Sequence, residues 1–125
     1  MASTLTQKLR IKNGFQISVL NAPSGMREKL DLPASVSVNE RLDGQFDLIW
    51  YFATQRADLQ RDIQALAAAM KPGALLWLTY PKGGSGVSSD LKRDVLWEVA
   101  GPAGLEPVAQ IAVDDVWTAL RFKGV

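Results

Sequence analysis

The chain has 125 residues, enough for one domain (1–125) and too few for two of ordinary size. It contains no cysteine and no histidine, which excludes disulfides, thiol chemistry, histidine-based triads and zinc sites within one chain. The spacing of its carboxylates does not match a calcium-binding loop either, so no metal site is predicted. Its 14 basic and 13 acidic residues leave a net charge of +1, and without a basic run or an aromatic RNA-binding signature nucleic-acid binding is not favoured.

The N-terminal residues are polar, and no apolar stretch in the chain exceeds the length of a strand. Residues 1–14 lack the apolar core of a signal peptide, and we expect them to be loosely held, with a turn at Asn13 and Gly14. The apolar stretches elsewhere are too short to span a bilayer. These features predict a cytoplasmic protein without a membrane partner.

Two short strands are predicted in the first third of the chain. Residues 16–20 are apolar and of strand length, and the stretch 21–25, with its proline, ends that strand. Ser24 could cap a short helix that ends before Pro33. Residues 35–38 form a weak second strand.

A strand, a helix and a further strand follow. Residues 46–53 are almost continuously apolar, which is typical of a central strand buried on both faces. Apolar residues recur at helical spacing along 58–70, and the Lys-Pro-Gly sequence at 71–73 is a stop signal. Residues 74–80 then form a second buried strand.

The last third begins with a glycine-rich loop at 81–86. Ser88 or Ser89 could cap the helix that follows it. Residues 108–113 and 117–122 are strands, and the second alternates as a hairpin partner or an edge strand does. The connection between them is so short that they must run antiparallel.

Strands alternate with helices up to this last pair, which predicts an α/β, three-layer Rossmann-like fold with a mostly parallel sheet. Ligands of such sheets bind outside the carboxyl ends of the strands, where the strand order reverses. The segments expected at that edge are polar or rich in glycine: 21–25, 39–40, 54–56, 80–86 and 114–117.

The segment from Phe46 onward resembles the second half of the class I S-adenosylmethionine-dependent methyltransferases, and the resemblance covers most of the chain. The resemblance rests on the Phe-Asp-Leu sequence at 46–48, a helix ending in Met-Lys-Pro-Gly at 70–73 before an apolar strand, and the closing pair at 108–122. It implies a truncated methyltransferase sheet with strand order 2-1-3-4-6-5, numbered along the chain, and a C-terminal antiparallel hairpin.

The chain is also similar to a small bacterial family catalogued as domain of unknown function 3052. The similarity lies in the sequences at 19–23, 46–48, 75–77, 81–86, 90–94 and 113–117. It spans nearly the whole chain and is the more specific of the two resemblances. It implies no activity, since none is assigned to that family.

The methyltransferase resemblance implies a cofactor site after the first strand. A working enzyme of that class has several glycines there, which let the backbone approach the cofactor closely. Here the stretch 21–25 holds one glycine and a proline, so its glycine motif is degraded. Glu40 could hold ribose hydroxyls, although exposed glutamates are common. S-adenosylmethionine therefore stays possible as a cofactor and is not assigned.

The loop that begins at Lys82 is the best candidate site from the residues alone. Backbone N–H groups before a helix, together with a lysine and the Ser85 hydroxyl, suit an anion such as phosphate. The loop is not a P-loop, because its lysine precedes the glycines. Its glycines are equally explained by a flexible connection.

Three other features have a structural and a functional interpretation. Asp90 and Arg93 could pair on the surface of a helix. Asp114 and Asp115 form a turn or supply carboxylates to a site. The four tryptophans are core candidates, but Trp117 could instead stack on a ligand.

Three functions are compatible with these residues. The first is a domain that binds a small anionic or nucleotide-like ligand, whether or not it is an enzyme; in an enzyme Lys82 would stabilise negative charge. The second is a non-catalytic interaction module, for example a homo-oligomer paired along residues 117–122. The third, an active methyltransferase, is disfavoured by the degraded loop. The ligand pocket of the first would contain Asn21, Lys82, Ser85, Gly86, Asp90, Arg93, Asp115 and Trp117.

Overall fold

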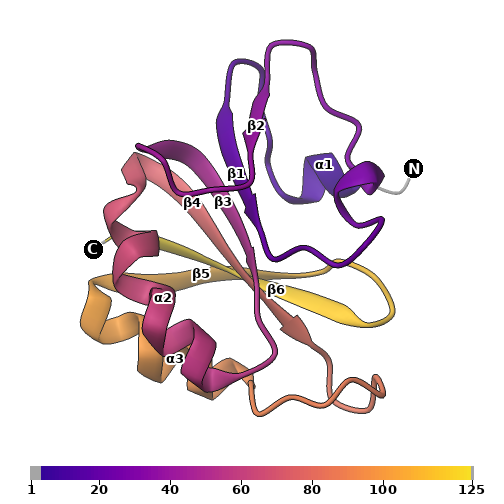
Figure 1. The fold of residues 1–125 in the computed structure, drawn as a ribbon, viewed down its shortest axis with the longest axis vertical. Coiled ribbons are helices and arrows are strands. Elements are labelled where there is room, and N and C mark those ends of the chain that lie inside the picture. The colour runs from indigo at the N-terminus through magenta and orange to yellow at the C-terminus, as the bar shows by residue number, and fades with distance from the viewer. Residues whose placement is uncertain (1–3, 125) are drawn as a thin grey trace.

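Figure 1 shows the computed structural model, which describes residues 4–124. Its strands are β1 (Gln16–Leu20), β2 (Ser37–Asn39), β3 (Phe46–Phe52), β4 (Met70–Pro81), β5 (Leu105–Ala112) and β6 (Trp117–Gly124). Its helices are α1 (Leu5–Lys8), α2 (Arg56–Ala68) and α3 (Arg93–Ala100), with 3-10 turns η1 (Arg27–Lys29) and η2 (Gly101–Ala103).

All six strands belong to one sheet, in the order β2-β1-β3-β4-β6-β5. The first four strands are parallel, and β6 runs antiparallel to both β4 and β5. This confirms the predicted α/β Rossmann-like fold, its strand order and its closing hairpin. Because β6 lies between two strands, it has no free edge, and the hypothesis of pairing with another chain along residues 117–122 is wrong.

The two faces of the sheet bury separate apolar clusters. Helices α2 and α3 lie side by side on one face (Figure 1), over a cluster that includes Ile49 and Tyr51 of β3. The opposite face is covered by residues around α1 and by the segment between β1 and β2, which pack with Trp50 and Phe52. Strand β3 is therefore buried on both faces, as its continuous apolar sequence predicts.

From residue 4 the N-terminal segment forms α1 and packs Leu9 and Ile11 against the sheet, whereas residues 1–3 of the segment expected to be loosely held lie outside the described range. Thr4 and Gln7 form a reciprocal capping box at the start of α1. Leu9 is fully buried, and its carbonyl accepts a hydrogen bond from the Trp77 indole at 2.9 Å. Contacts across the sheet thus order a segment whose own sequence is polar.

Sheet pairing also overrides a local stop signal. Strand β4 begins at Met70, so the Lys-Pro-Gly sequence lies inside the strand instead of ahead of it. Met70 pairs with Phe46, whose N–H donates to the carbonyl of Ala69 at 2.8 Å. Gly73 adopts a positive φ of 79°, which only glycine adopts readily and which lets the chain continue into the strand.

Other elements differ from prediction in length or exposure. Helix α3 begins at Arg93, because Ser89 does not cap it and instead donates to the carbonyl of Thr54 at 2.6 Å. The helix predicted after Ser24 is only the turn η1. Trp97 was expected in the core, but it is 48% exposed. Within residues 4–124, no helix has the length and apolarity needed to cross a bilayer.

Candidate functional site

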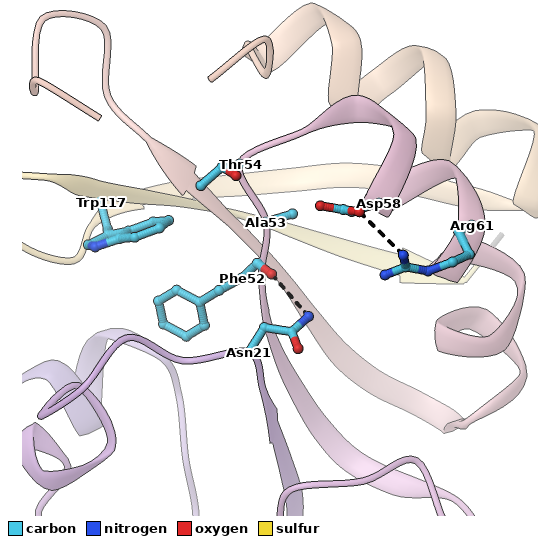
Figure 2. Close-up of a pocket in the computed structure, with 7 residues that line it drawn as sticks. All are labelled: Asn21, Phe52, Ala53, Thr54, Asp58, Arg61 and Trp117. Carbon is cyan, nitrogen blue, oxygen red and sulfur yellow. Dashed lines mark hydrogen bonds and ion pairs between the residues drawn. The ribbon is translucent and has the colours of Figure 1, made fainter. Parts of the chain in front are cut away.

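A cavity of about 260 Å³ opens at the carboxyl edge of the sheet (Figure 2). It lies at the ends of β1 and β3, where the strand order reverses, because β2 lies on one side of β1 and β3 on the other. The topology therefore places this cavity where ligands of open α/β sheets bind. Its lining residues are Asn21, Phe52, Ala53, Thr54, Asp58, Arg61 and Trp117.

Asn21 sits between the two strand ends. Its φ of 60° is in the left-handed region, which asparagine tolerates better than most residues. Its side-chain amide donates to the carbonyl of Phe52 at 3.4 Å, as Figure 2 shows. This long bond holds the amide across the gap between β1 and β3 and leaves its oxygen and second N–H for a ligand.

Aromatic side chains form one wall of the cavity. The rings of Phe52 and Trp117 meet edge to face with centroids 5.4 Å apart, and Phe52 in turn contacts Trp50. Asp114 positions Trp117, because its Oδ1 accepts the N–H groups of Val116 and Trp117, each at 2.8 Å. Trp117 is thus a half-buried flat surface that a planar ring can contact.

The same hydrogen bonds lower the pKa of Asp114 in the β5–β6 turn. Burial raises the pKa of Asp114, but the N–H groups of Trp117 and Val116 and the Lys29 ammonium outweigh it, so that its pKa lies below the usual value. Asp114 is therefore a turn-stabilising residue, as the structural interpretation has it. Asp115 is exposed and makes no side-chain hydrogen bond within residues 4–124.

Charged residues of α2 form the other wall. Arg61 donates through Nη1 to Asp58 at 3.3 Å, and through Nε and Nη2 to the two carboxylate oxygens of Asp62 at 3.0 and 3.1 Å. Asp62 also accepts the Tyr51 hydroxyl at 2.7 Å. The Arg61 hydrogen bond, against the opposing effect of burial, lowers the pKa of Asp62, and the Tyr51 hydroxyl lowers it further. The guanidinium is thereby held at the rim of the cavity.

A second cavity, of about 390 Å³, shares Asn21 with the first. It is formed by the segment after β1, Arg27, Glu28 and Glu40 at the end of β2. Arg27 and Glu40 form an exposed ion pair at 2.8 Å. Glu40 therefore lies at the predicted edge, although its carboxylate already has a partner.

The eight residues predicted for one pocket do not form one. Asn21 and Trp117 share the first cavity, whereas Lys82 and Arg93 line two others described below. The remaining four line none of these cavities: Ser85, Gly86, Asp90 and Asp115. The pocket residues Phe52, Thr54, Asp58 and Arg61 were missed. The available signal was a carboxylate and an arginine three residues apart at the start of the helix that follows β3.

The predicted pairing of Asp90 with Arg93 is also wrong. Asp90 Oδ1 accepts the backbone N–H of Arg56, the first residue of α2, at 2.6 Å. Arg93 instead lies over the ring of Trp97, 5.7 Å from its centroid. Because Gln55 makes no side-chain cap for α2, Asp90 caps this helix from a distant part of the chain.

We expect Asp90→Ala to lower the free energy of unfolding by about 1 kcal/mol, the usual cost of losing a helix N-cap. Urea denaturation followed by circular dichroism measures it. Asp115→Ala is the matched control, since that exposed aspartate caps nothing. Equal effects of the two substitutions would show that Asp90 does not stabilise α2.

Within residues 4–124, no group of three or more carboxylates converges on a point that could hold a metal ion.

No family model and no curated protein sequence matches the chain, so its similarity to the small bacterial family stays a prediction.

Solved structures share the fold at low sequence identity. An S-adenosylmethionine-dependent methyltransferase from Clostridium acetobutylicum is 10% identical with a TM-score of 0.62, over 86% of this chain and 83% of that one. A ribosomal protein L11 methylase from Lactobacillus delbrueckii subsp. bulgaricus is 11% identical with a TM-score of 0.63, over 96% and 74%. The [4+2]-cyclase SpnF is 13% identical with a TM-score of 0.63, over 96% and 79%. Activities differ among these proteins, so the likeness shows the fold alone. The chain therefore has the fold of class I S-adenosylmethionine-dependent methyltransferases.

Proposed function

We propose that the protein binds a nucleoside-like small molecule in the two cavities that meet at Asn21. The observation that carries this proposal is the position of the two cavities, which share Asn21 at the carboxyl edge where the strand order reverses. The first cavity offers the flat side chain of Trp117 and the hydrogen-bonding groups of Asn21 and Thr54. The second offers the carboxylate of Glu40, a good acceptor for sugar hydroxyls.

The charges of the two cavities favour the nucleoside over its phosphates. Their lining contains three carboxylates, Asp58, Glu28 and Glu40, against two guanidiniums, those of Arg27 and Arg61. Both guanidiniums already pair with carboxylates. A dense negative charge gains little there, whereas a neutral ligand meets no repulsion and a cationic ligand is attracted.

Only part of S-adenosylmethionine fits these residues. Its nucleoside half matches the groups just described. Its amino-acid end would lie against the segment after β1, where Pro23 has no N–H and the N–H of Met26 already donates to the carbonyl of Pro23 at 3.0 Å. We therefore propose binding and derive no methyl transfer.

The test is calorimetric titration of the full chain with adenosine, cytidine and S-adenosylhomocysteine. We expect at least one nucleoside to bind, and Asn21→Gly to weaken it about tenfold, since one pocket hydrogen-bonding side chain is worth roughly 1.4 kcal/mol. Glycine keeps the positive φ, so the fold is undisturbed. Asn13→Gly, at an exposed turn, is the control.

Two outcomes oppose parts of this proposal. Absence of nucleoside binding at millimolar concentration, or equal weakening by both glycine variants, would overturn it. Much tighter binding of S-adenosylhomocysteine than of adenosine would show instead that the amino-acid end is also recognised.

A further inference from the structure

A second group of side chains surrounds two other cavities, near the ends of β4 and β5. One has a volume of about 510 Å³ and is lined by Tyr80, Lys82, Gly83, Gln110, Ile111, Ala112 and Thr118. The other has a volume of about 290 Å³ and is lined by Lys92, Arg93, Asp94 and Gln110. Both cavities have Gln110 in their lining, so they lie close together, and their linings bring Lys82, Lys92 and Arg93 to the same part of the surface.

This region carries a net positive charge. The lining of the two cavities contains three cations and a single carboxylate, that of Asp94. Within residues 4–124, none of the three cations forms an ion pair. The net positive charge of the two cavity linings favours an anion there.

The backbone of Lys82 is held by hydrogen bonds, although the loop that follows it is rich in glycine. Its N–H donates to the carbonyl of Val116 at 2.7 Å, and its carbonyl accepts the N–H of Ser85 at 3.2 Å. Arg93 is placed by the start of α3 and by its contact with the Trp97 ring. Both cationic side chains therefore project from anchored backbone.

The floor of the larger cavity supplies a neutral donor. Tyr80, Thr118 and Ala112 lie side by side across β4, β6 and β5. The Thr118 hydroxyl already bonds Gln110 and the Ile111 carbonyl, but the Tyr80 hydroxyl has no partner in the described part of the chain. Burial raises the pKa of Tyr80 despite the opposing charge of Arg93, so the phenol remains protonated at neutral pH.

We propose that Lys82 and Arg93, with the Tyr80 hydroxyl, bind a compact anion such as a phosphate or carboxylate group. This site is separate from the nucleoside cavities. Trp117 faces the first of those cavities, and Thr118, the next residue of β6, faces the anion cavity on the opposite face of the sheet.

The probe is inorganic phosphate, titrated into the ¹⁵N-labelled full chain and followed by NMR. We expect saturable shifts at the amides of Lys82 and Arg93. The double variant K82A/R93A should weaken binding at least about tenfold, because it removes both charged donors from the site.

The double variant K8A/K12A is the control. It removes the same net charge from two exposed lysines that form no ion pair within residues 4–124. Absence of saturable phosphate binding, or an equal loss in the control, would overturn the proposal. Acetate in place of phosphate distinguishes a carboxylate site from a phosphate site. Adenosine binding should be unchanged in K82A/R93A, which separates this proposal from the nucleoside site.

Discussion

Trp77→Ala is expected to lower the free energy of unfolding by about 3–5 kcal/mol, the usual cost of deleting a buried aromatic side chain. The Trp77 side chain is 1% exposed, and its indole N–H satisfies the Leu9 carbonyl beneath α1. The substitution therefore leaves a cavity and an unpaired buried acceptor together. Thermal unfolding followed by circular dichroism measures the loss. If the alanine variant does not fold, Trp77→Phe, which keeps most of the volume, gives a smaller loss in the same direction.

Trp97→Ala is the matched control for this experiment. The same atoms are removed from a side chain that is 48% exposed and stacks only on Arg93. We expect a loss of about 1 kcal/mol or less, which is the range of an exposed cation–π contact. Equal losses at the two positions would contradict the burial of Trp77 and the ordering of the N-terminal segment over it.

Tyr51→Phe is expected to lower the free energy of unfolding by about 1–2 kcal/mol at neutral pH. It removes the 2.7 Å bond from the hydroxyl to the partly solvated Asp62 carboxylate, which keeps its bonds to Arg61. Urea denaturation at several pH values measures it. Tyr80→Phe is the control, since that hydroxyl has no partner within residues 4–124 and its loss should cost little.

The two ends of the pH range test the same network. Burial, and then the hydrogen bond to Asp62, raises the pKa of Tyr51 above its usual value near 10. Its contribution to stability is present below pH 10 and is lost as the pH rises further, by up to about 1.4 kcal/mol per unit. Tyr51→Phe should therefore flatten the alkaline limb of the stability curve.

At the acid end the sign is opposite. The pKa of Asp62 is lowered, first by Arg61 and then by Tyr51, so its contribution is present above its unfolded value near 4 and is lost as the pH falls through the folded pKa. Without the Tyr51 hydroxyl this pKa rises, and the variant should lose less stability on acidification than the parent chain. Parallel curves for the two proteins would contradict the network.

Strong local patterns predicted their elements correctly. The apolar run at 46–53 became β3 (Phe46–Phe52), buried on both faces, and the periodic residues after Asp58 became α2. The strand order came from the resemblance to the methyltransferases and was right. Such patterns succeed because each depends on neighbours within one or two turns or strand repeats.

Weak or conflicting local patterns were decided by distant partners. The polar sequence before Gly14 gives no sign that Leu9 is buried, because the burial comes from Trp77, far along the chain. A Lys-Pro-Gly sequence normally stops a helix and precedes a strand, but pairing with β3 begins at Met70, before it. Trp97 has the large apolar side chain that is typical of a core residue, but it lies on the exposed side of α3.

The amino-acid sequence by itself determined the fold class and the edge of the sheet at which polar residues gather, since both follow from the alternation of apolar strands and helices. Only the tertiary structure decided which of those polar residues meet. The Ser89 hydroxyl donates to the carbonyl of Thr54, and the Asp90 carboxylate accepts the backbone N–H of Arg56. Asp90 therefore caps α2 and does not face a ligand. Strand β6 places Trp117 and Thr118 on opposite faces, so that Trp117 and Lys82, which we predicted in one pocket, line two different cavities. Side-chain direction and long-range hydrogen bonds depend on contacts between residues tens of positions apart, which no local pattern records.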